Sequence, residues 1–407
     1  MNNIKETNGG VCAAKGYKAS GIYAGIRKNK SKKDLSLIFS EKKAAAACVY
    51  TQNLVKGAPL KVTKSNVEDG FAQAVVCNSG NANTCNANGI EIAEGMCALV
   101  AEQLEISEKD VVVASTGVIG QPLSLDPIKA AMPELCKSLS YDGSSMAAEG
   151  IMTTDTKAKE IAVSFEIGGK EVKIGGIAKG SGMIHPNMAT MLVFITTDCA
   201  ISSKMLQKAL SKDVEDSFNM ISIDGDTSTN DMVCILANGM AEKNEISCEG
   251  AEFDVFCKAL SVITQTLCKA IAKDGEGATK LLECNVCGGK TEKDAKIIAK
   301  SVVCSSLLKA AMFGKDANWG RILCAIGYSG AYCDVEKVGV HLKSENGDIE
   351  VCKNGSGVDF SEELALKILT PDEIEINITL GDGDAKASAW GCDLTYDYVK
   401  INGDYRT

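Results

Sequence analysis

The order of apolar and polar residues predicts strands and helices that occur in separate blocks. Continuous or alternating apolar runs indicate strands at residues 35–40, 46–51, 72–77, 111–114, 161–165, 171–177, 338–342, 348–352, 373–380 and 386–398, and one from Thr190. Apolar residues three or four positions apart indicate helices at 91–104, 127–137, 203–218, 252–272 and 292–312. Because the two kinds of element do not alternate regularly, the sequence favours an α+β fold over a doubly wound sheet.

The segment 179–192 runs from a glycine-rich loop into a buried strand and contains the Ala189-Thr190 bond. A small residue before a Thr at the head of a strand is what an N-terminal-nucleophile enzyme requires. The Thr hydroxyl attacks the preceding carbonyl, the chain is cut, and the new amine then activates the hydroxyl. Taken alone, the pattern is more typical of a turn before an ordinary strand, and the rest of the chain decides between the two.

The composition is that of a globular protein with one large or two ordinary domains. The chain has 407 residues, of which 45% are hydrophobic and 24% charged. A net charge of -10 argues against nucleic acid as a partner. The apolar runs have strand length and the N-terminal residues are polar, so neither a membrane-spanning helix nor a signal peptide is expected.

Eighteen cysteines are scattered through apolar stretches of the chain. Cys284 and Cys287 alone have the spacing of metal ligands, and they lack a second cysteine pair or a nearby histidine pair. We therefore expect free cysteines packed as small hydrophobic residues, no metal site, and a reducing cytoplasm as the location.

Two histidines, His185 and His341, are the only imidazoles that a catalytic relay could use. Both also suit ordinary structural positions, and His341 lies in a predicted strand. A free α-amine, with a reference pKa of about 7.7–8.0, is then an attractive base for acyl transfer.

The segment 112–120 combines a buried strand with a Thr116-Gly117 turn. Glycine lets a ligand oxygen approach the backbone, and the threonine hydroxyl can donate beside the amide, so the pair can form an oxyanion hole. The alternative is a simple turn between a strand and a helix.

Two further segments carry polar residues suited to a site. Glu276 lies between two glycines after a long predicted helix and can pair with a substrate ammonium group; the alternative is a solvated helix end. Segment 77–89 holds five asparagines and two glycines after a buried strand. It predicts either a packed polar turn near an active site or a surface loop.

Together these segments resemble the ornithine acetyltransferase family of arginine biosynthesis, also called glutamate N-acetyltransferase. The resemblance covers essentially the whole chain. Its most specific parts are residues 115–120, 152–156, 179–192, 274–280, 313–321 and 401–407.

The resemblance implies self-cleavage between Ala189 and Thr190, which leaves an α chain of residues 1–189 and a β chain of residues 190–407. The implied fold is a layered αββα sandwich similar to N-terminal-nucleophile hydrolases. The implied assembly is a heterotetramer of two α and two β chains.

The resemblance also assigns roles to single residues. Thr190 is the implied nucleophile, and Thr116 with Gly117 the implied oxyanion hole. The implied substrate-binding residues are Thr153 or its neighbour Thr154, Lys179, Thr190, Glu276, Asn402 and Thr407. Lys179 suits a substrate carboxylate and Glu276 a substrate ammonium group, because both contacts are charge-assisted.

The implied activity is acetyl transfer from N-acetylornithine to glutamate by a ping-pong mechanism through an acetyl-Thr190 ester. The expected partners are these small molecules and the protein's own chains, with neither nucleic acid nor membrane. No cofactor is expected, and acetyl-CoA as a second acetyl donor stays open. The alternatives are a self-cleaving aminopeptidase or amide hydrolase of related fold, and an uncleaved protein that only binds a ligand.

Overall fold

A computed structural model describes residues 4–29, 31–185, 191–241 and 244–403. The described residues form two compact units. Unit 1 comprises the described residues within Met1–Gly180, Asn187–Glu215 and Thr227–Leu267. Unit 2 comprises the described residues within Ser181–Pro186, Asp216–Asp226 and Cys268–Thr407.

The described strands of unit 1 form a nine-stranded mixed sheet in the order β1-β6-β7-β8-β10-β3-β4-β5, with β2 also paired to β3. Their bounds are β1 Lys5–Thr7, β2 Tyr17–Ile22, β3 Leu35–Tyr50, β4 Phe71–Asn78, β5 Val111–Ser115, β6 Lys159–Ile167, β7 Lys170–Lys179, β8 Leu192–Thr197 and β10 Met232–Ala237. The predicted hairpin is confirmed as β6 and β7. Its turn residues Gly168 and Gly169 have φ of 52° and 77°, which suits a two-residue hairpin.

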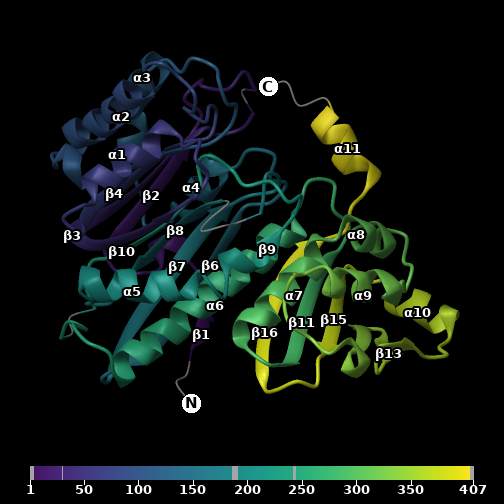
Figure 1. The fold of residues 1–407 in the computed structure, drawn as a ribbon. Helices are drawn as coiled ribbons and strands as arrows, with labels where there is room; N and C mark the ends of the chain where they lie inside the picture. The colour runs from purple at the N-terminus through teal and green to yellow at the C-terminus, as the bar shows by residue number, and fades with distance from the viewer. Residues whose placement is uncertain (1–3, 30, 186–190, 242–243, 404–407) are drawn as a thin grey trace. The chain divides into compact units, whose positions relative to one another are not determined.

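Helices cover both faces of this sheet. Their bounds are α1 Ala58–Asn66, α2 Gly89–Leu104, α3 Asp126–Lys137, α4 Ser144–Ile151 and α5 Ser203–Asp213. α1, α2 and α3 lie together in Figure 1; α1 and α2 pack on β5, and α3 packs on β2 and β3. Met96 of α2, Met132 of α3 and Val113 of β5 belong to one apolar core. On the other face, Ile151 of α4 joins a core that includes Phe194 and Cys234.

The centre of the sheet is buried on both faces. Every residue of β8 and β10 is buried. β10 is a continuous apolar run, and β8 is apolar up to its last two residues, Thr196 and Thr197, so neither strand alternates. β8 pairs with β10 in parallel and with β7 in antiparallel orientation. The position of β8 is therefore fixed from both sides.

The described strands of unit 2 form a seven-stranded sheet in the order β14-β13-β12-β15-β11-β16-β9. Their bounds are β9 Ile221–Ser222, β11 Leu281–Gly289, β12 Gly339–Ser344, β13 Gly347–Lys353, β14 Ser356–Gly357, β15 Glu373–Thr379 and β16 Ala385–Cys392. The helices are α7 Glu292–Cys304, α8 Ser306–Phe313, α9 Trp319–Gly327, α10 Glu362–Ile368 and α11 Tyr396–Gly403. α7 packs on β11 and β16. The predicted α+β class is confirmed.

Two predicted helices are shorter in the structure. The segment 292–312 is divided into α7 and α8, because the Ser305 hydroxyl accepts a hydrogen bond from the Leu308 amide and starts a new helix. The helix predicted over 203–218 ends at Asp213.

Three strand predictions also need correction. Segments 35–40 and 46–51 belong to one strand, β3, whose pairing with β4 is irregular where the polar residues lie. The strand predicted over 386–398 ends at Cys392, and α11 follows it. Asp393 ends the strand by accepting hydrogen bonds from two backbone amides. β10 was not predicted, although all six of its residues are apolar.

α6 Ala251–Lys273 corrects the expectation that every apolar run has strand length. Among the described residues it is the one helix long and apolar enough to cross a membrane by length and composition, with half of its most apolar window buried. Its buried residues, including Phe256, Leu260, Ile263 and Leu267, recur every three or four positions. That single buried stripe is typical of a core helix.

Candidate functional site

The start of β8 lies between the neighbouring strands β7 and β10 of unit 1. Lys179, the last residue of β7, lies opposite Leu192, and Met232 at the head of β10 pairs with Leu192 from the other side. The Met232 amide donates a 2.9 Å hydrogen bond to the Met191 carbonyl. The chain therefore enters the sheet at Leu192, between Lys179 and Met232 and two residues after Thr190 in the sequence.

Three of the predicted residues, Ala189, Thr190 and Thr407, lie outside the described residues. Cleavage at the first two and substrate contact by the third therefore stay predictions. The described chain resumes at Met191, the residue that directly follows the predicted nucleophile.

Asp155 connects one predicted threonine to the end of β7. One of its carboxylate oxygens accepts from the Thr153 amide at 3.0 Å, and the other accepts from the Gly180 amide and the Lys159 ammonium, each at 2.7 Å. Burial alone would raise the pKa of Asp155, but the charges of Lys179 and Lys159 outweigh burial and hold it well below its usual value.

The structure therefore brings predicted Thr153 close to predicted Lys179, with the carboxylate of Asp155 between them. Thr153 and Thr154 are both half-buried, and Lys179 is buried. The role of Asp155 was not predicted from the sequence, because the contact that joins it to the end of β7, the Gly180 amide, is 25 positions away.

The Thr116-Gly117 turn has a geometry that suits an oxyanion hole. The Thr116 amide donates to the Asn78 carbonyl at 2.9 Å. The Thr116 hydroxyl and the Gly117 amide have no hydrogen-bond partner within the described part of the chain, so both can donate to a ligand. Gly117 has φ of 127°, and a Cβ there would lie 2.9 Å from the Asn81 amide nitrogen. Only glycine fits this position.

Asn230 ties this turn to the asparagine-rich segment. Its side-chain amide donates to the carbonyls of Ser115 and Ala82, at 2.9 and 2.5 Å, and its oxygen accepts from the Thr84 hydroxyl. Residues 78–84 are mostly buried, so the packed polar turn is the correct alternative there. Asn230, directly after Thr229 in an acid-rich turn, was missed as a site residue.

Two predicted substrate-binding residues meet within unit 2. The side-chain amide of Asn402 donates to a carboxylate oxygen of Glu276 at 2.8 Å, and the Glu276 amide donates to the Ser181 carbonyl. A Cβ on Gly182 would lie 2.5 Å from the Glu276 carboxylate, so the glycine makes room for it. Glu276 is half-buried and held, which rules out a freely solvated helix end.

The loop before the predicted cleavage point is also fixed within unit 2. The Asp224 carboxylate accepts from the backbone amides of Met183 and Ile184, at 2.6 and 2.9 Å. Nδ1 of His185 lies 3.1 Å from the Ser222 hydroxyl oxygen. Burial and the charge of Lys300 lower the pKa of His185 to about 4, so this imidazole is neutral at pH 7.

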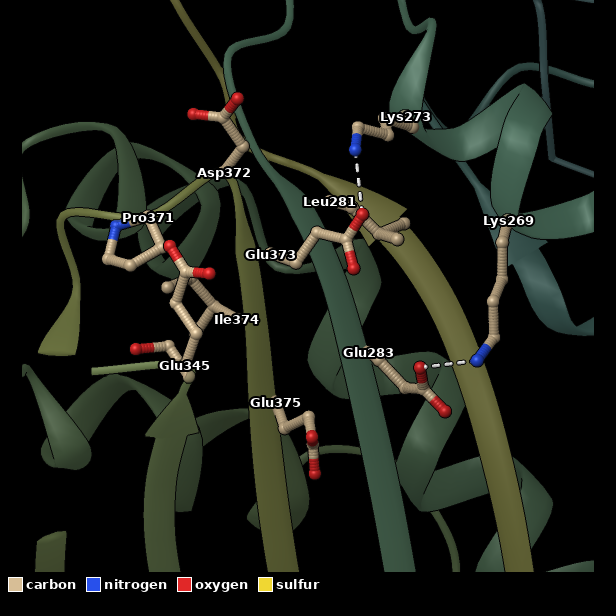
Figure 2. Close-up of a pocket in the computed structure, with 11 residues that line it drawn as sticks. Lys269, Lys273, Leu281, Glu283, Glu345, Pro371, Asp372, Glu373, Ile374 and Glu375 are labelled. Atoms are coloured by element: carbon tan, nitrogen blue, oxygen red, sulfur yellow. Dashed lines mark hydrogen bonds and ion pairs between the residues drawn. The ribbon is translucent and has the colours of Figure 1, made fainter. Parts of the chain in front are cut away.

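A pocket of about 560 Å³ in unit 2 does not include any predicted site residue. Figure 2 shows carboxylates of β11 and β15 facing lysines of α6, with Lys269 paired to Glu283 and Lys273 paired to Glu373. These ion pairs account for much of the charge in the pocket.

Comparison with known proteins identifies the family. A model of the ArgJ family matches residues 18–407. The chain belongs to the ArgJ family. The predicted membership in the acetyltransferase family of arginine biosynthesis is thereby confirmed, and the ArgJ match extends over both units.

Relatives of known name agree with this result. The "Arginine biosynthesis bifunctional protein ArgJ" of Caldanaerobacter subterraneus is 52% identical over 401 residues, covering 98% of this chain and 99% of the relative. The protein of the same name from Bacillus subtilis is 48% identical, covering 100% and 98%. The crystal structure of the Bacillus halodurans ArgJ protein is 46% identical, with a TM-score of 0.50, and covers 52% of this chain and 98% of that one. The predicted ornithine acetyltransferase type of fold is confirmed.

Replacing Asp155 with Asn should lower the free energy of unfolding by about 3–5 kcal/mol, because it leaves the buried Lys159 ammonium without its charge partner. Glu149→Gln, which removes an exposed partner of Lys33, should cost less than about 1 kcal/mol. Urea unfolding measures both. A cost of Asp155→Asn no larger than that of the control would contradict this role.

The ion pair between Asp155 and Lys159 also predicts that stability depends on pH. The pKa of Asp155 is lower in the folded protein than in the unfolded chain. The contribution of Asp155 to the free energy of unfolding is therefore fully present above its pKa in the unfolded chain, about 3.9, and is lost as pH falls through its lower pKa in the folded protein. Wild type should lose more stability on acidification than Asp155→Asn does, as measured by urea unfolding at several pH values.

Proposed function

We propose that this protein transfers the acetyl group of N-acetylornithine to glutamate, giving ornithine and N-acetylglutamate in arginine biosynthesis. The proposal rests on membership in the ArgJ family and on one structural observation. Buried β8 begins two residues after Thr190 in the sequence, and its first residue, Leu192, pairs with Lys179.

Self-cleavage between Ala189 and Thr190 would divide the protein into chains of 1–189 and 190–407. The solved Bacillus halodurans chain supports this division, because 98% of its length matches only 52% of this chain. A relative of about half the length is what cleavage near the middle would produce. We further propose that two α and two β chains assemble as a heterotetramer.

The mechanism we propose is ping-pong. The amine of Thr190 takes the hydroxyl proton, and the oxygen attacks the acetyl carbonyl. The hydroxyl of Thr116 and the amide of Gly117 hold the oxyanion, and donors of this kind each contribute about 2.7–4 kcal/mol. Ornithine leaves, and the glutamate amine then takes the acetyl group from the Thr190 ester.

Substrate recognition follows from charge. Lys179 is assigned to the substrate carboxylate, with Thr153 or Thr154 beside it. Glu276, which Asn402 holds by its amide, is assigned to the side-chain ammonium of ornithine. Thr407 stays a predicted substrate contact. All eighteen cysteines are free and ten are buried, which suits a reducing cytoplasm as the location.

Thr190→Ala tests the proposal directly. The variant should remain one uncut chain and should not acetylate glutamate, whereas wild type should yield two chains with a new N-terminal threonine. A denaturing gel with N-terminal sequencing follows the cut, and a glutamate acetylation assay follows the activity. Full activity of Thr190→Ala would refute the proposal, and release of free acetate without glutamate acetylation would favour the amide hydrolase alternative.

Gly117→Ala should lower kcat/KM by about 100-fold or more, because the new Cβ would displace the backbone that shapes the oxyanion hole. Gly120→Ala is the matched control, since Gly120 also has positive φ (75°) but nothing lies within 4 Å of its Cβ position. Steady-state kinetics on cleaved protein compare the two. Equal rates in both variants would argue against an oxyanion hole at Gly117.

Acetyl-CoA is proposed as a second acetyl donor, supported by the word "bifunctional" in the names of the relatives. Wild type given acetyl-CoA as the sole donor should form N-acetylglutamate, and Thr190→Ala should not. Chromatography of the products measures this. Absence of product with acetyl-CoA, beside normal transfer from N-acetylornithine, would show a monofunctional enzyme.

A further inference from the structure

Asn230 is a buried side chain that uses every hydrogen-bonding position of its amide. It is 5% exposed. Its nitrogen donates to the carbonyls of Ser115 and Ala82, at 2.9 and 2.5 Å, and its oxygen accepts from the hydroxyls of Thr84 and Thr229, at 2.5 and 2.6 Å. A side-chain amide has two N–H donors and two lone pairs on its oxygen. The orientation of this amide is therefore fixed, because turning it over would set its oxygen against two carbonyls.

The two carbonyls that Asn230 holds lead to the two ends of the Thr116-Gly117 turn. Ser115 directly precedes the turn, and Val118 directly follows it. The Ala82 amide donates to the Val118 carbonyl at 3.0 Å, so Ala82 joins Asn230 to the far end of the turn. One side chain is thus connected to the backbone before and after the two candidate oxyanion donors.

An oxyanion hole depends on the aim of its donors. The Thr116 hydroxyl and the Gly117 amide can stabilise one oxyanion only if both point at the same place. Displacement of a catalytic group by about 1 Å costs on the order of 100-fold in rate. Donors that are already in place also need no reorganisation as charge develops. A contact that fixes both ends of the turn therefore acts on the rate of acetyl transfer.

Asn230 and the turn lie on opposite sides of the predicted cleavage point in the sequence. Asn230 belongs to the proposed β chain of 190–407, whereas Ser115, Ala82 and Val118 belong to the proposed α chain of 1–189. Ser115 and Asn230 are 115 positions apart. Once the chain is cut, the hydrogen bonds of Asn230 join two separate chains.

We propose that Asn230 is a positioning residue for the oxyanion hole, which the β chain supplies to the donors of the α chain. Asn230 acts through the backbone of Ser115 and Ala82 and aims the Thr116 hydroxyl and the Gly117 amide. This inference rests on the proposed acetyl transfer and adds a residue to it. It concerns the transfer of the acetyl group and not the cut of the chain.

Asn230→Leu tests the inference, because leucine has a similar size but neither donates nor accepts a hydrogen bond. Cleaved wild type and cleaved variant are compared by steady-state kinetics with N-acetylornithine and glutamate. We expect kcat to fall by about 10- to 100-fold, the loss typical of misplaced donors. KM for N-acetylornithine should stay unchanged, because the lost interaction is made with the oxyanion of the transition state and not with the bound substrate.

Asn238→Leu is the matched control, since Asn238 is a buried amide at the other end of β10. It is 3% exposed, directly follows the last residue of β10, and donates to the Lys15 carbonyl and the Ser40 hydroxyl at 2.9 and 3.2 Å. Its oxygen accepts from the Met240 amide at 3.1 Å. The control should lose thermal stability to a similar extent as Asn230→Leu but should keep a kcat close to that of wild type.

Combination with Gly117→Ala gives a readout that a merely structural role of Asn230 would not move. If Asn230 acts through the turn, both changes damage the same hydrogen bonds to the oxyanion. Asn230→Leu should then lower kcat much less in the Gly117→Ala background than in wild type, because residues that act as a unit are not additive. Two changes that act separately would multiply their effects.

Thermal melting shows which variants fold. If the leucine variants do not fold, Asn230→Asp and Asn238→Asp repeat the comparison, because aspartate has the same size as asparagine and a carboxylate cannot donate a hydrogen bond.

Three results would overturn the inference. They are equal kcat in the Asn230 and Asn238 variants, multiplied effects of Asn230→Leu and Gly117→Ala, and folded Asn230 variants that do not cleave although those of Asn238 do. A wild type that does not acetylate glutamate, or Gly117→Ala with the wild-type rate, would instead overturn the proposed function itself.

Discussion

Burial of β8 between β7 and β10 is the constraint on which the rest of the account depends. All six residues of β8 are buried, and hydrogen bonds hold the strand on both sides. A strand in this position cannot shift by one residue without moving its side chains to the opposite faces of the sheet. Met191, whose carbonyl accepts a hydrogen bond from the Met232 amide, is thus held at a fixed point before β8.

Buried polar residues make that point chemically distinct from the apolar core around it. Asp155 holds the end of β7, and Asn230 holds the turn at Thr116. Each of these side chains satisfies several backbone groups that would otherwise be buried without partners. Rigid placement of this kind lets oxyanion donors act without reorganising during the reaction.

The sequence predicted the parts of the site that depend on local pattern. Gly117 follows a buried strand, and its positive φ explains why a glycine stands there. The loop before Thr190 and the acidic turn at Glu276 were also found from composition and spacing. β10 was not predicted, although its residues form a plain apolar run directly after an acid-rich turn.

Long-range contacts account for what the sequence could not predict. Asn230 bonds to the carbonyl of Ala82, 148 positions away, and Asp155 bonds to Gly180, 25 positions away. No local spacing shows such partners. In the same way, the division of 292–312 into two helices depends on one hydroxyl, that of Ser305, competing with the helical pattern.

Trapping the acetyl-enzyme is the most direct measurement of the central claim. Active protein would be mixed with N-acetylornithine in the absence of glutamate, quenched in acid, and its chains analysed by mass spectrometry with fragmentation. The account predicts one added acetyl group on the side-chain oxygen of Thr190, at the first position of the second chain, and its loss when glutamate is added. An acetyl group on any other residue, or turnover without a labelled Thr190, would contradict it.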